Sequence, residues 1–349
     1  MLEKPDRGKA VAAAAGPLSP ALKPAKRPAS HTRRVIEFVV TLAIGGGLLY
    51  GTLHFVDMRA VGEGLRKIGY GAALLAAVMA VAQILICSWR WQIVTRETTQ
   101  PLRLQDTLLG FFEGTFVSAF LPSVIASDGV RVLRAISSGA TPTNAFVGVV
   151  TDRLVALFGL AIAAMSGVVF LPGATDNPWL LTAIVGILPM FLLGVVALDV
   201  LSKLFVRLSQ WRIMRPFLEL SSYMRRLRQM PKLTLLVIAI SLVGHMGCAA
   251  AFYILGNQLG IGVGYWAMFA LSAPILVYAA VPISIGGWGI REAVTAALFG
   301  LVGVEPAAAV ALSIAFGLLM SGVGMFCGGV ALLVSLRRRA MRGRGRAAP

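Results

Sequence analysis

The chain has 349 residues, of which 57% are hydrophobic and only 13% are charged, and its mean hydropathy is +0.81. A soluble domain carries about 25% charged residues, so this composition excludes an ordinary soluble protein. The apolar residues form continuous runs rather than the alternating pattern of a transmembrane barrel. The expected fold class is therefore all-α, a polytopic helical membrane protein.

The basic residues are concentrated in three segments of a chain whose net charge is +17. Eight Lys and Arg lie in 1–34, eight in 201–232 and six in 337–349. Such clusters mark the cytoplasmic side of a membrane protein and can contact anionic lipid headgroups. Nucleic-acid binding is the rival explanation of the charge, but the sequence has no aromatic-interleaved basic patch or nucleic-acid motif to support it.

The N-terminal part is predicted to start with a disordered basic tail over 1–34, where Ala, Pro and Lys/Arg dominate. A first membrane span follows at about 35–56 and a second at about 71–94. Between them, 57–71 has apolar residues at helical spacing and is expected to lie on the membrane interface.

The second span ends at Trp89, Arg90 and Trp91. We interpret this triplet as an interfacial aromatic anchor with a snorkelling arginine. A short polar loop over 95–105 then leads to the next apolar segment.

The stretch 106–138 is too interrupted for two clean spans. Glu113 breaks an apolar run that ends at Pro122, and the segment after it carries several charges. Proline removes a backbone donor and ends a helix, and a full span needs about 20 residues. We expect a broken, partly re-entrant helical hairpin, while two thin full spans would give the same topology.

The remainder of the chain repeats this alternation of long and broken elements. The segment 201–232 is expected to form one or two amphipathic cytoplasmic helices, and 265–303 a second broken element. An Arg-rich cytoplasmic tail, 337–349, ends the chain. Further full spans are expected at 142–171, 178–200, 233–257 and 306–336.

Two twelve-residue stretches, Leu121–Val132 and Val281–Glu292, align without gaps. A proline, an isoleucine, a glycine and an arginine coincide, each 160 positions apart. Proline and glycine inside an apolar region indicate irregular backbone, which a bilayer tolerates only in a buried or wet place. The residues of this hairpin motif are Pro122, Gly129, Pro282, Gly286, Gly287 and Gly289.

Charge and element order together predict the topology. Both termini and 201–232 are expected in the cytoplasm, whereas 172–177 and 258–264 have no Lys or Arg and are expected outside. Each half reads span, span, broken hairpin, span, and the halves start on opposite sides. Repeat 1 (about 35–171) and repeat 2 (about 178–336) would thus be inverted, with a substrate site at their interface.

Charged residues within the predicted membrane region are the candidates for substrate binding. A charge at the centre of a helix costs about 2.5–3.5 kcal/mol on insertion scales, so it usually faces a cavity or a partner. These candidates are Glu113, Asp128, Arg131, Asp152, Arg153, Arg291 and Glu292.

Arg131 and Arg291 hold equivalent positions in the two repeats, and the guanidinium fork suits phosphate. We expect both to face a shared central cavity and to contact a phosphate-bearing ligand such as a lipid headgroup. The alternative is structural, with Glu292 paired to Arg131 or Asp152 paired to Arg291 so that the charges hold the hairpins.

The sequence contains no catalytic triad, metal-binding cluster or phosphate loop, so we assign no catalytic residue, cofactor or metal. A membrane-embedded lipid-modifying transferase remains an alternative, with Asp128 or Asp152 as the base. Three cysteines fall in predicted spans without metal-ligand spacing, and we expect them to be small buried apolar residues.

The Leu-Pro-Ser-x-Ile-x-x-Asp-x-x-Arg run at 121–131, the Asp152-Arg153 pair and the Ile-Gly-Gly-x-Gly-x-Arg-Glu run at 285–292 resemble the lysylphosphatidylglycerol synthase transmembrane region family. The resemblance covers about 35–336. The integral domain of that family is described as flippase-like, and aminoacyl transfer belongs to a separate soluble domain. We therefore expect no synthase activity from this chain.

The resemblance implies a lipid translocase of the bacterial inner membrane that moves a phosphate-bearing or related lipid between leaflets. Membrane lipid is the expected partner, and lipid-synthesis enzymes are possible ones. Two alternatives remain: the lipid-modifying transferase, and a non-transporting scaffold of a lipid or envelope synthesis complex.

Overall fold

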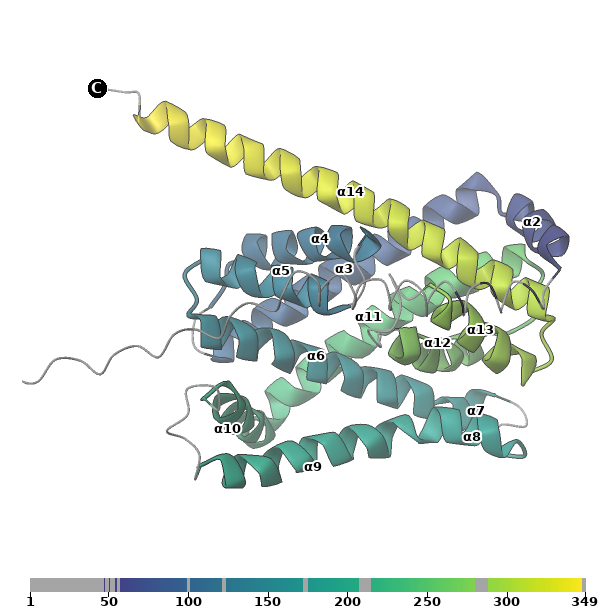
Figure 1. Cartoon of the computed structure of the whole chain (residues 1–349), viewed down its shortest axis with the longest axis horizontal. Helices are drawn as coiled ribbons and strands as arrows, with labels where there is room; N and C mark the ends of the chain where they lie inside the picture. The colour runs from purple at the N-terminus through teal and green to yellow at the C-terminus, as the bar shows by residue number, and fades with distance from the viewer. Residues whose placement is uncertain are drawn as a thin grey trace, which may run out of the picture. The chain divides into compact units, whose positions relative to one another are not determined.

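The structure is a computed structural model that describes 57–98, 101–120, 124–171, 175–206, 215–279 and 288–346, together with residues 47, 50 and 54. The regular structure of these residues is helical throughout (Figure 1). The helices of the N-terminal part are α2 (Met58–Lys67), α3 (Tyr70–Thr98), α4 (Leu104–Phe120), α5 (Val124–Ser137), α6 (Pro142–Met165) and α7 (Gly167–Phe170). Those of the C-terminal part are α8 (Pro178–Val185), α9 (Ile187–Val206), α10 (Arg215–Gln229), α11 (Pro231–Gln258), α12 (Tyr265–Ala279), α13 (Ile290–Gly300) and α14 (Pro306–Arg346).

Four stretches of helix are long and apolar enough to cross a membrane. They are Tyr70–Arg96, Pro142–Phe170, Pro231–Gln258 and Pro306–Arg338. They coincide with four of the predicted spans, so the all-helical membrane fold is confirmed. The predicted span 178–200 corresponds to α8 and α9, which meet at Gly186. The predicted span 35–56 and the tail 1–34 lie outside the described residues, apart from residues 47, 50 and 54.

Proline marks the start of several helices. Pro142, Pro178, Pro231 and Pro306 are the first residues of α6, α8, α11 and α14. At this position the missing N–H would have no intrahelical acceptor, and the fixed φ already suits a helix. The basic segment from residue 337, predicted as a cytoplasmic tail, continues α14 to Arg346, because arginine, alanine and methionine favour helix.

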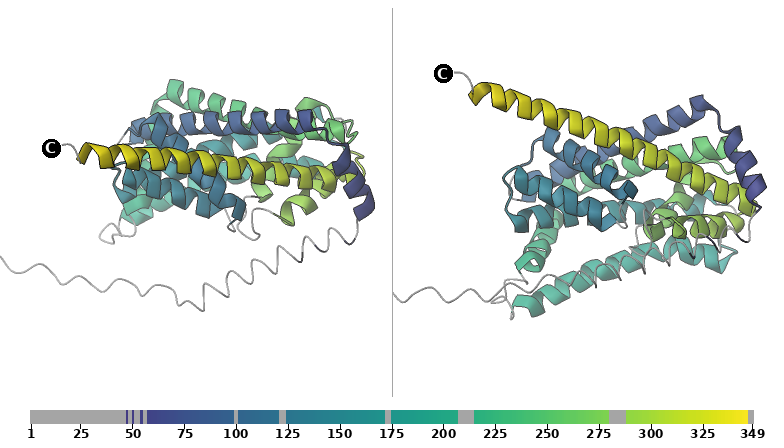
Figure 2. Two further views of the ribbon diagram at one scale, coloured as in Figure 1. Left: turned by 90° about the horizontal axis from the view of Figure 1, so that it is seen from above. Right: turned by 45° about the horizontal axis from the view of Figure 1, so that its top comes forward.

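Both segments predicted to lie on a membrane surface contain a helix: α2 in 57–71 and α10 in 201–232, although 201–206 belong to α9. In α2, the buried Val61 packs against Ala307, Val310 and Ala311 of α14. These residues lie at the start of α14, which is the end of α14 nearest α2 in Figure 2. The basic residues of its last turn, Arg66 and Lys67, are exposed. The other is α10, which is the described part of the segment between α9 and α11.

Helix α6 lies at the centre of the helix packing. It contacts α3, α5, α9, α10, α11 and α12 (Figure 1). Small residues allow the helices to approach closely, as is usual in membrane bundles. A Cβ added at Gly159 of α6 would lie 2.8 Å from the Ser241 Oγ of α11, and one added at Gly247 would lie 3.4 Å from the carbonyl oxygen of Met79 on α3. These approaches bring the polar side chains of α3, α6 and α11 together.

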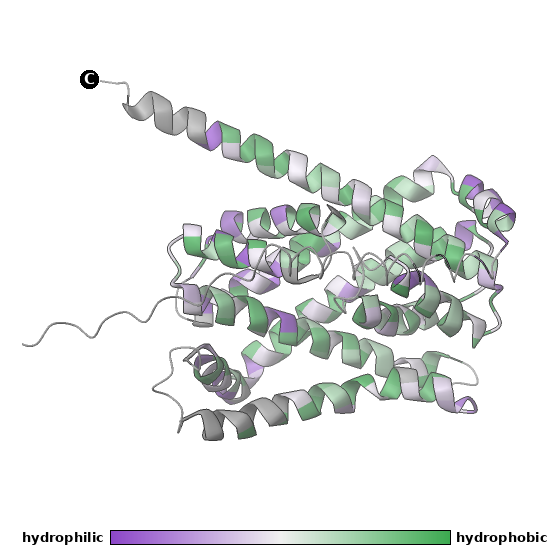
Figure 3. Cartoon of the chain, in the orientation of Figure 1, coloured by the Kyte–Doolittle hydropathy of each residue, from purple (hydrophilic) through white to green (hydrophobic). Residues whose placement is uncertain are grey.

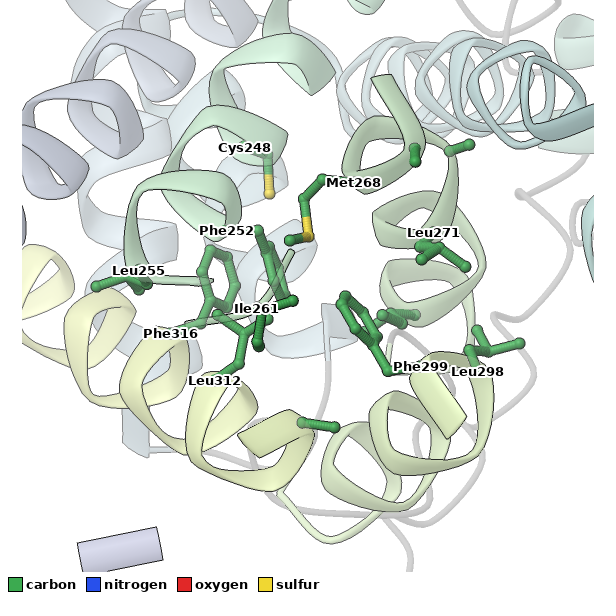
Figure 4. Packing of buried hydrophobic residues seen from close by; sticks show 14 of the residues in the cluster. Cys248, Phe252, Leu255, Ile261, Met268, Leu271, Leu298, Phe299, Leu312 and Phe316 are labelled. Carbon is green, nitrogen blue, oxygen red and sulfur yellow. The ribbon is translucent and has the colours of Figure 1, made fainter. Parts of the chain in front are cut away.

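The largest buried cluster is formed mainly by α11, α12, α13 and α14 (Figure 4), and it also includes Ala76 of α3 and Leu180 and Ile184 of α8. The rings of Phe252 and Phe316 stack with centroids 4.0 Å apart, and Phe299, Met268 and Leu312 are almost fully buried around them. Lipid tails are as apolar as these side chains, so close van der Waals packing, rather than removal from water, holds such helices together inside a membrane.

The outward-facing surface of the long helices is also apolar (Figure 3). Leu193 and Val196 of α9 are 70% and 57% exposed, and Phe326 and Leu332 of α14 are both 60% exposed. Large contiguous apolar patches are rare on soluble monomers. Surfaces of this kind are suited to contact lipid.

Both predicted hairpins consist of two short helices in contact, α4 with α5 and α12 with α13. Pro122 falls between α4 and α5, and Pro282, Gly286 and Gly287 fall between α12 and α13; all four lie outside the described residues. The aligned glycines differ locally. Gly289 ends the turn before α13 with φ 88°, a conformation that favours glycine, whereas Gly129 lies inside α5.

Candidate functional site

Asp152 on α6 is the centre of a buried group of charges. It is only 1% exposed, and it lies about 15 Å along the helix from Pro142 at 1.5 Å per residue. Its Oδ1 accepts a 2.8 Å hydrogen bond from Arg90 Nε of α3, and its Oδ2 accepts one of 2.6 Å from Arg131 Nη2 of α5. Arg90 Nη2 also donates to Oδ2 at 3.2 Å. One carboxylate therefore joins three helices.

Asp128 on α5 extends this group toward the surface. Its Oδ1 accepts hydrogen bonds from Arg131 Nη1 at 3.3 Å and from Arg153 Nη2 at 2.7 Å, and its Oδ2 accepts one from Arg153 Nε at 3.1 Å. The side chain of Arg153 is 36% exposed, in contrast to the buried Arg131. The five residues Arg90, Asp152, Arg131, Asp128 and Arg153 thus form a continuous chain of ion pairs, here called the arginine–aspartate network.

Arg131 lies between aromatic side chains on the inner side of the network. Its guanidinium carbon is 4.4 Å from the ring centroid of Trp91 and 4.2 Å from that of Phe111, within the range of a cation–π interaction. Several buried N–H groups here have no acceptor among the described residues: Arg131 Nε, Trp91 Nε1, and Nε and Nη2 of Arg134. Arg134 Nη2 lies 3.6 Å from Glu113 Oε1, an ion-pair distance rather than a hydrogen bond.

The charges of this region do not balance. The network has three arginines and two aspartates, and adding the Arg134–Glu113 pair leaves the excess of one positive charge unchanged. Arginine has donors only, and so has the indole of Trp91. The four unpartnered atoms of Arg131, Trp91 and Arg134 are therefore all donors, and an anionic oxygen is the group that would satisfy them. The other buried side-chain atoms without a partner among the described residues can accept a hydrogen bond: Gln83 Oε1, Thr151 Oγ1 and His245 Nδ1.

Arg90 was missed by the sequence reasoning, and its assignment as a snorkelling residue is wrong. It is 3% exposed, Trp91 is fully buried, and of the triplet only Trp89 is exposed. Besides Asp152, Arg90 binds the Ser241 hydroxyl of α11 through Nη1 at 2.7 Å. The sequence did contain a signal: apolar residues continue after Arg90, at Ile93 and Val94. In the structure α3 accordingly continues to Thr98, so Arg90 does not end the helix.

A second buried group of charges lies at the start of α13. Glu292 is completely buried, and its Oε1 accepts from Arg291 Nη2 at 2.7 Å and from the Ser313 hydroxyl at 2.9 Å. Its Oε2 accepts from the backbone N–H of Gly289 at 2.6 Å and so caps the helix. The Arg291 guanidinium carbon is 4.7 Å from the ring centroid of Trp288. We call Arg291, Glu292 and Ser313 the α13–α14 clasp.

The α13–α14 clasp requires a glycine on α14. A Cβ at Gly317 would overlap Arg291 Nη2 and lie 2.8 Å from its Cζ and 2.9 Å from Cη2 of Trp288. We expect Gly317→Ala to lower the free energy of unfolding by about 1–3 kcal/mol, because the arginine must leave its partners. Denaturant unfolding in detergent micelles measures the loss.

Gly322→Ala is the matched control on the same helix. No atom lies within 4 Å of a Cβ at Gly322, so this change should raise stability by up to about 1 kcal/mol through helix propensity. Equal effects of the two substitutions would contradict the assignment of Gly317 to the clasp.

The structure brings together four of the predicted site residues and separates the others. Asp128, Arg131, Asp152 and Arg153 lie in the arginine–aspartate network, Glu113 pairs with Arg134 beside it, and Arg291 and Glu292 form the clasp. In the structural alternative, the charges pair with one another, and they do; the two pairings named for it, Glu292 with Arg131 and Asp152 with Arg291, are wrong. Adjacent or packed helices supply nearer partners, so Arg131 and Arg291 each form their ion pairs within their own half of the chain.

A family model for the lysylphosphatidylglycerol synthase transmembrane region matches residues 38–339. The chain belongs to this family. The match includes both ion-pair groups and all the described helices up to the last turns of α14. A comparison with curated proteins gave no match. Membership agrees with an integral membrane protein that has a role connected with lipids.

Proposed function

We propose that this protein moves a lipid with an anionic headgroup between the leaflets of a membrane. The observation that carries the proposal is the excess of positive charge and of unpaired N–H donors around Arg131, inside a helical domain with an apolar exterior. A buried cation is costly in a bilayer and usually marks a substrate pathway. Phosphate oxygens would accept hydrogen bonds from the unpaired N–H groups and would neutralise the excess positive charge.

In this proposal Arg131 and Arg153 contact the headgroup, while Asp128 and Asp152 hold them in place. Arg153 is the more exposed end of the network and would meet the headgroup first. Direct contact between Arg291 and an anion stays a prediction. Its donors Nε and Nη2 are already bound to Ser313 and Glu292, which weighs against such a contact.

Topology belongs to the same proposal. The order long helix, short helical pair, long helix occurs as α3, α4–α5, α6 and again as α11, α12–α13, α14. We propose that these sets are inverted repeats whose short pairs are re-entrant, as in secondary transporters. Basic residues favour cytoplasmic termini and a cytoplasmic α10, in a bacterial inner membrane.

A lipid-modifying transferase is the second candidate, and the geometry weighs against it. A base needs an oxygen free to accept a proton from its substrate. Both oxygens of Asp152 and both of Asp128 already accept hydrogen bonds from arginine. Among the described residues, no contact specifically favours a scaffold role.

The test is a leaflet-resolved assay in proteoliposomes that contain head-labelled phosphatidylglycerol or phosphatidylcholine. We expect the anionic lipid to cross faster than in protein-free vesicles, with unchanged mass. Arg131→Lys keeps the charge but loses the fork that bridges two aspartates. Loss of one charge-assisted hydrogen bond, worth about 1.5 kcal/mol, predicts an approximately tenfold lower rate.

Arg338→Lys is the control, because Arg338 forms an ion pair with Asp106 outside the network. It should translocate at the wild-type rate. A lack of translocation by the wild-type protein would refute the transport function. A changed lipid mass would favour the transferase, and a normal rate for Arg131→Lys would exclude Arg131 from the path.

A further inference from the structure

A partly open apolar cavity lies among α6, α9, α10 and α11, and none of its lining residues belongs to the arginine–aspartate network. Its volume is about 200 Å³, and its walls include Phe158 of α6, Phe191 and Leu192 of α9, Leu227 of α10 and Val237 of α11. The rings of Phe158 and Phe191 are 5.4 Å apart between centroids. The hydroxyl of Thr234, at the same wall, donates to the Leu227 carbonyl at 2.6 Å, so the lining offers little to a polar ligand.

A second, smaller cavity of about 130 Å³ adjoins the end of α10. Its walls include Tyr223, Arg226, Leu227 and Gln229, and Leu227 therefore lines both cavities. Tyr223 is buried, and its hydroxyl donates to the carbonyl of Val94 on α3 at 2.8 Å. This bond fixes α10 against α3, next to the two cavities that share Leu227.

The charge of α10 indicates the sign of a ligand at this place. The helix carries four arginines and one glutamate. Basic residues near a membrane surface attract anionic lipid. On the other side, Leu192 and Leu193 of α9 are 47% and 70% exposed, so the apolar cavity borders a surface suited to lipid.

We propose that this pair of cavities binds one membrane lipid with an anionic headgroup. One acyl chain occupies the apolar cavity, and the phosphate lies beside Arg226 and Gln229. An acyl chain suits a space of about 200 Å³ with an apolar lining, whereas a helix with side chains is about 10 Å across and needs a larger volume. The lipid would tie α9 and α10 to α6 and α11, and its binding does not depend on the proposed translocation.

Native mass spectrometry of the full chain in detergent tests the proposal. Phosphatidylglycerol is added, with phosphatidylcholine as the zwitterionic comparison. We expect the wild-type protein to retain one phosphatidylglycerol. Arg226→Glu should lower its retention about tenfold, because the local charge changes by two, with less effect on phosphatidylcholine. Leu192→Trp should remove most bound lipid by filling the apolar cavity.

Two controls separate the site from general effects. Leu193→Trp makes the same change on the neighbouring residue, which does not line the cavity, and Arg66→Glu reverses a charge on α2. Both should retain lipid like the wild type. Equal retention by all four variants would overturn the proposal. A doubled protein mass that Leu192→Trp abolishes would instead assign the cavity to a second copy of the chain.

Discussion

Replacing Asp152 by asparagine is expected to lower the free energy of unfolding by about 3–5 kcal/mol, the cost of breaking a buried ion pair. Asparagine has nearly the same size but no charge, so Arg90 and Arg131 would remain as buried cations, 3% and 2% exposed. Denaturant unfolding in detergent micelles measures the effect. Glu63→Gln, on the exposed side of α2, is the control and should change little.

A double substitution distinguishes lost pairing from a local packing defect. Arg90→Gln together with Asp152→Asn removes one of the unbalanced cations. The double variant should therefore lose less free energy of unfolding than the sum of the losses of the two single variants. The Ser241 hydroxyl, which accepts from Arg90 Nη1, can then accept from the glutamine amide. Strict additivity would contradict a direct energetic coupling between Arg90 and Asp152.

Replacing Glu292 by alanine is expected to have an effect of comparable size at the other end of the chain. The change leaves Arg291 without its counter-charge, at a cost of about 3–5 kcal/mol, and it removes the cap on the Gly289 N–H, worth about 1 kcal/mol more. Thermal unfolding of purified variants should rank wild type above Arg291→Lys, and Arg291→Lys above Glu292→Ala.

Glu292→Gln separates the two contributions. Its amide oxygen can still cap α13, but the charge opposite Arg291 is lost, so its stability should lie between those of Arg291→Lys and Glu292→Ala. A Glu292→Ala protein as stable as Glu292→Gln would show that the cap contributes nothing. A stable Glu292→Ala protein would contradict the clasp altogether.

The positions of the membrane helices could be predicted from the sequence with small errors. The spans at 71–94, 142–171 and 233–257 correspond to Tyr70–Thr98, Pro142–Phe170 and Pro231–Gln258. A helix in a bilayer satisfies its own backbone hydrogen bonds, so a long apolar run is sufficient to specify it. Proline at the first turn then sets where several of these helices begin.

The partners of the charged side chains could not be predicted in this way. The sequence identified Asp128, Arg131, Asp152 and Arg153 as costly charges that require partners, but it assigned Arg90 to the interface. The alignment that made Arg131 equivalent to Arg291 also gave no guide to their surroundings.

The tertiary structure alone decided that Arg90 and Asp152, 62 positions apart, form the inner end of the network. Helix α6 approaches α11 closely at Gly159 and contacts α3, which brings Arg90, Asp152 and Ser241 within hydrogen-bond distance. Hydrophobicity acts locally along each helix and can be read from sequence. Ion pairing depends on which helix faces pack together, and in a membrane the contacts of small residues largely determine that packing.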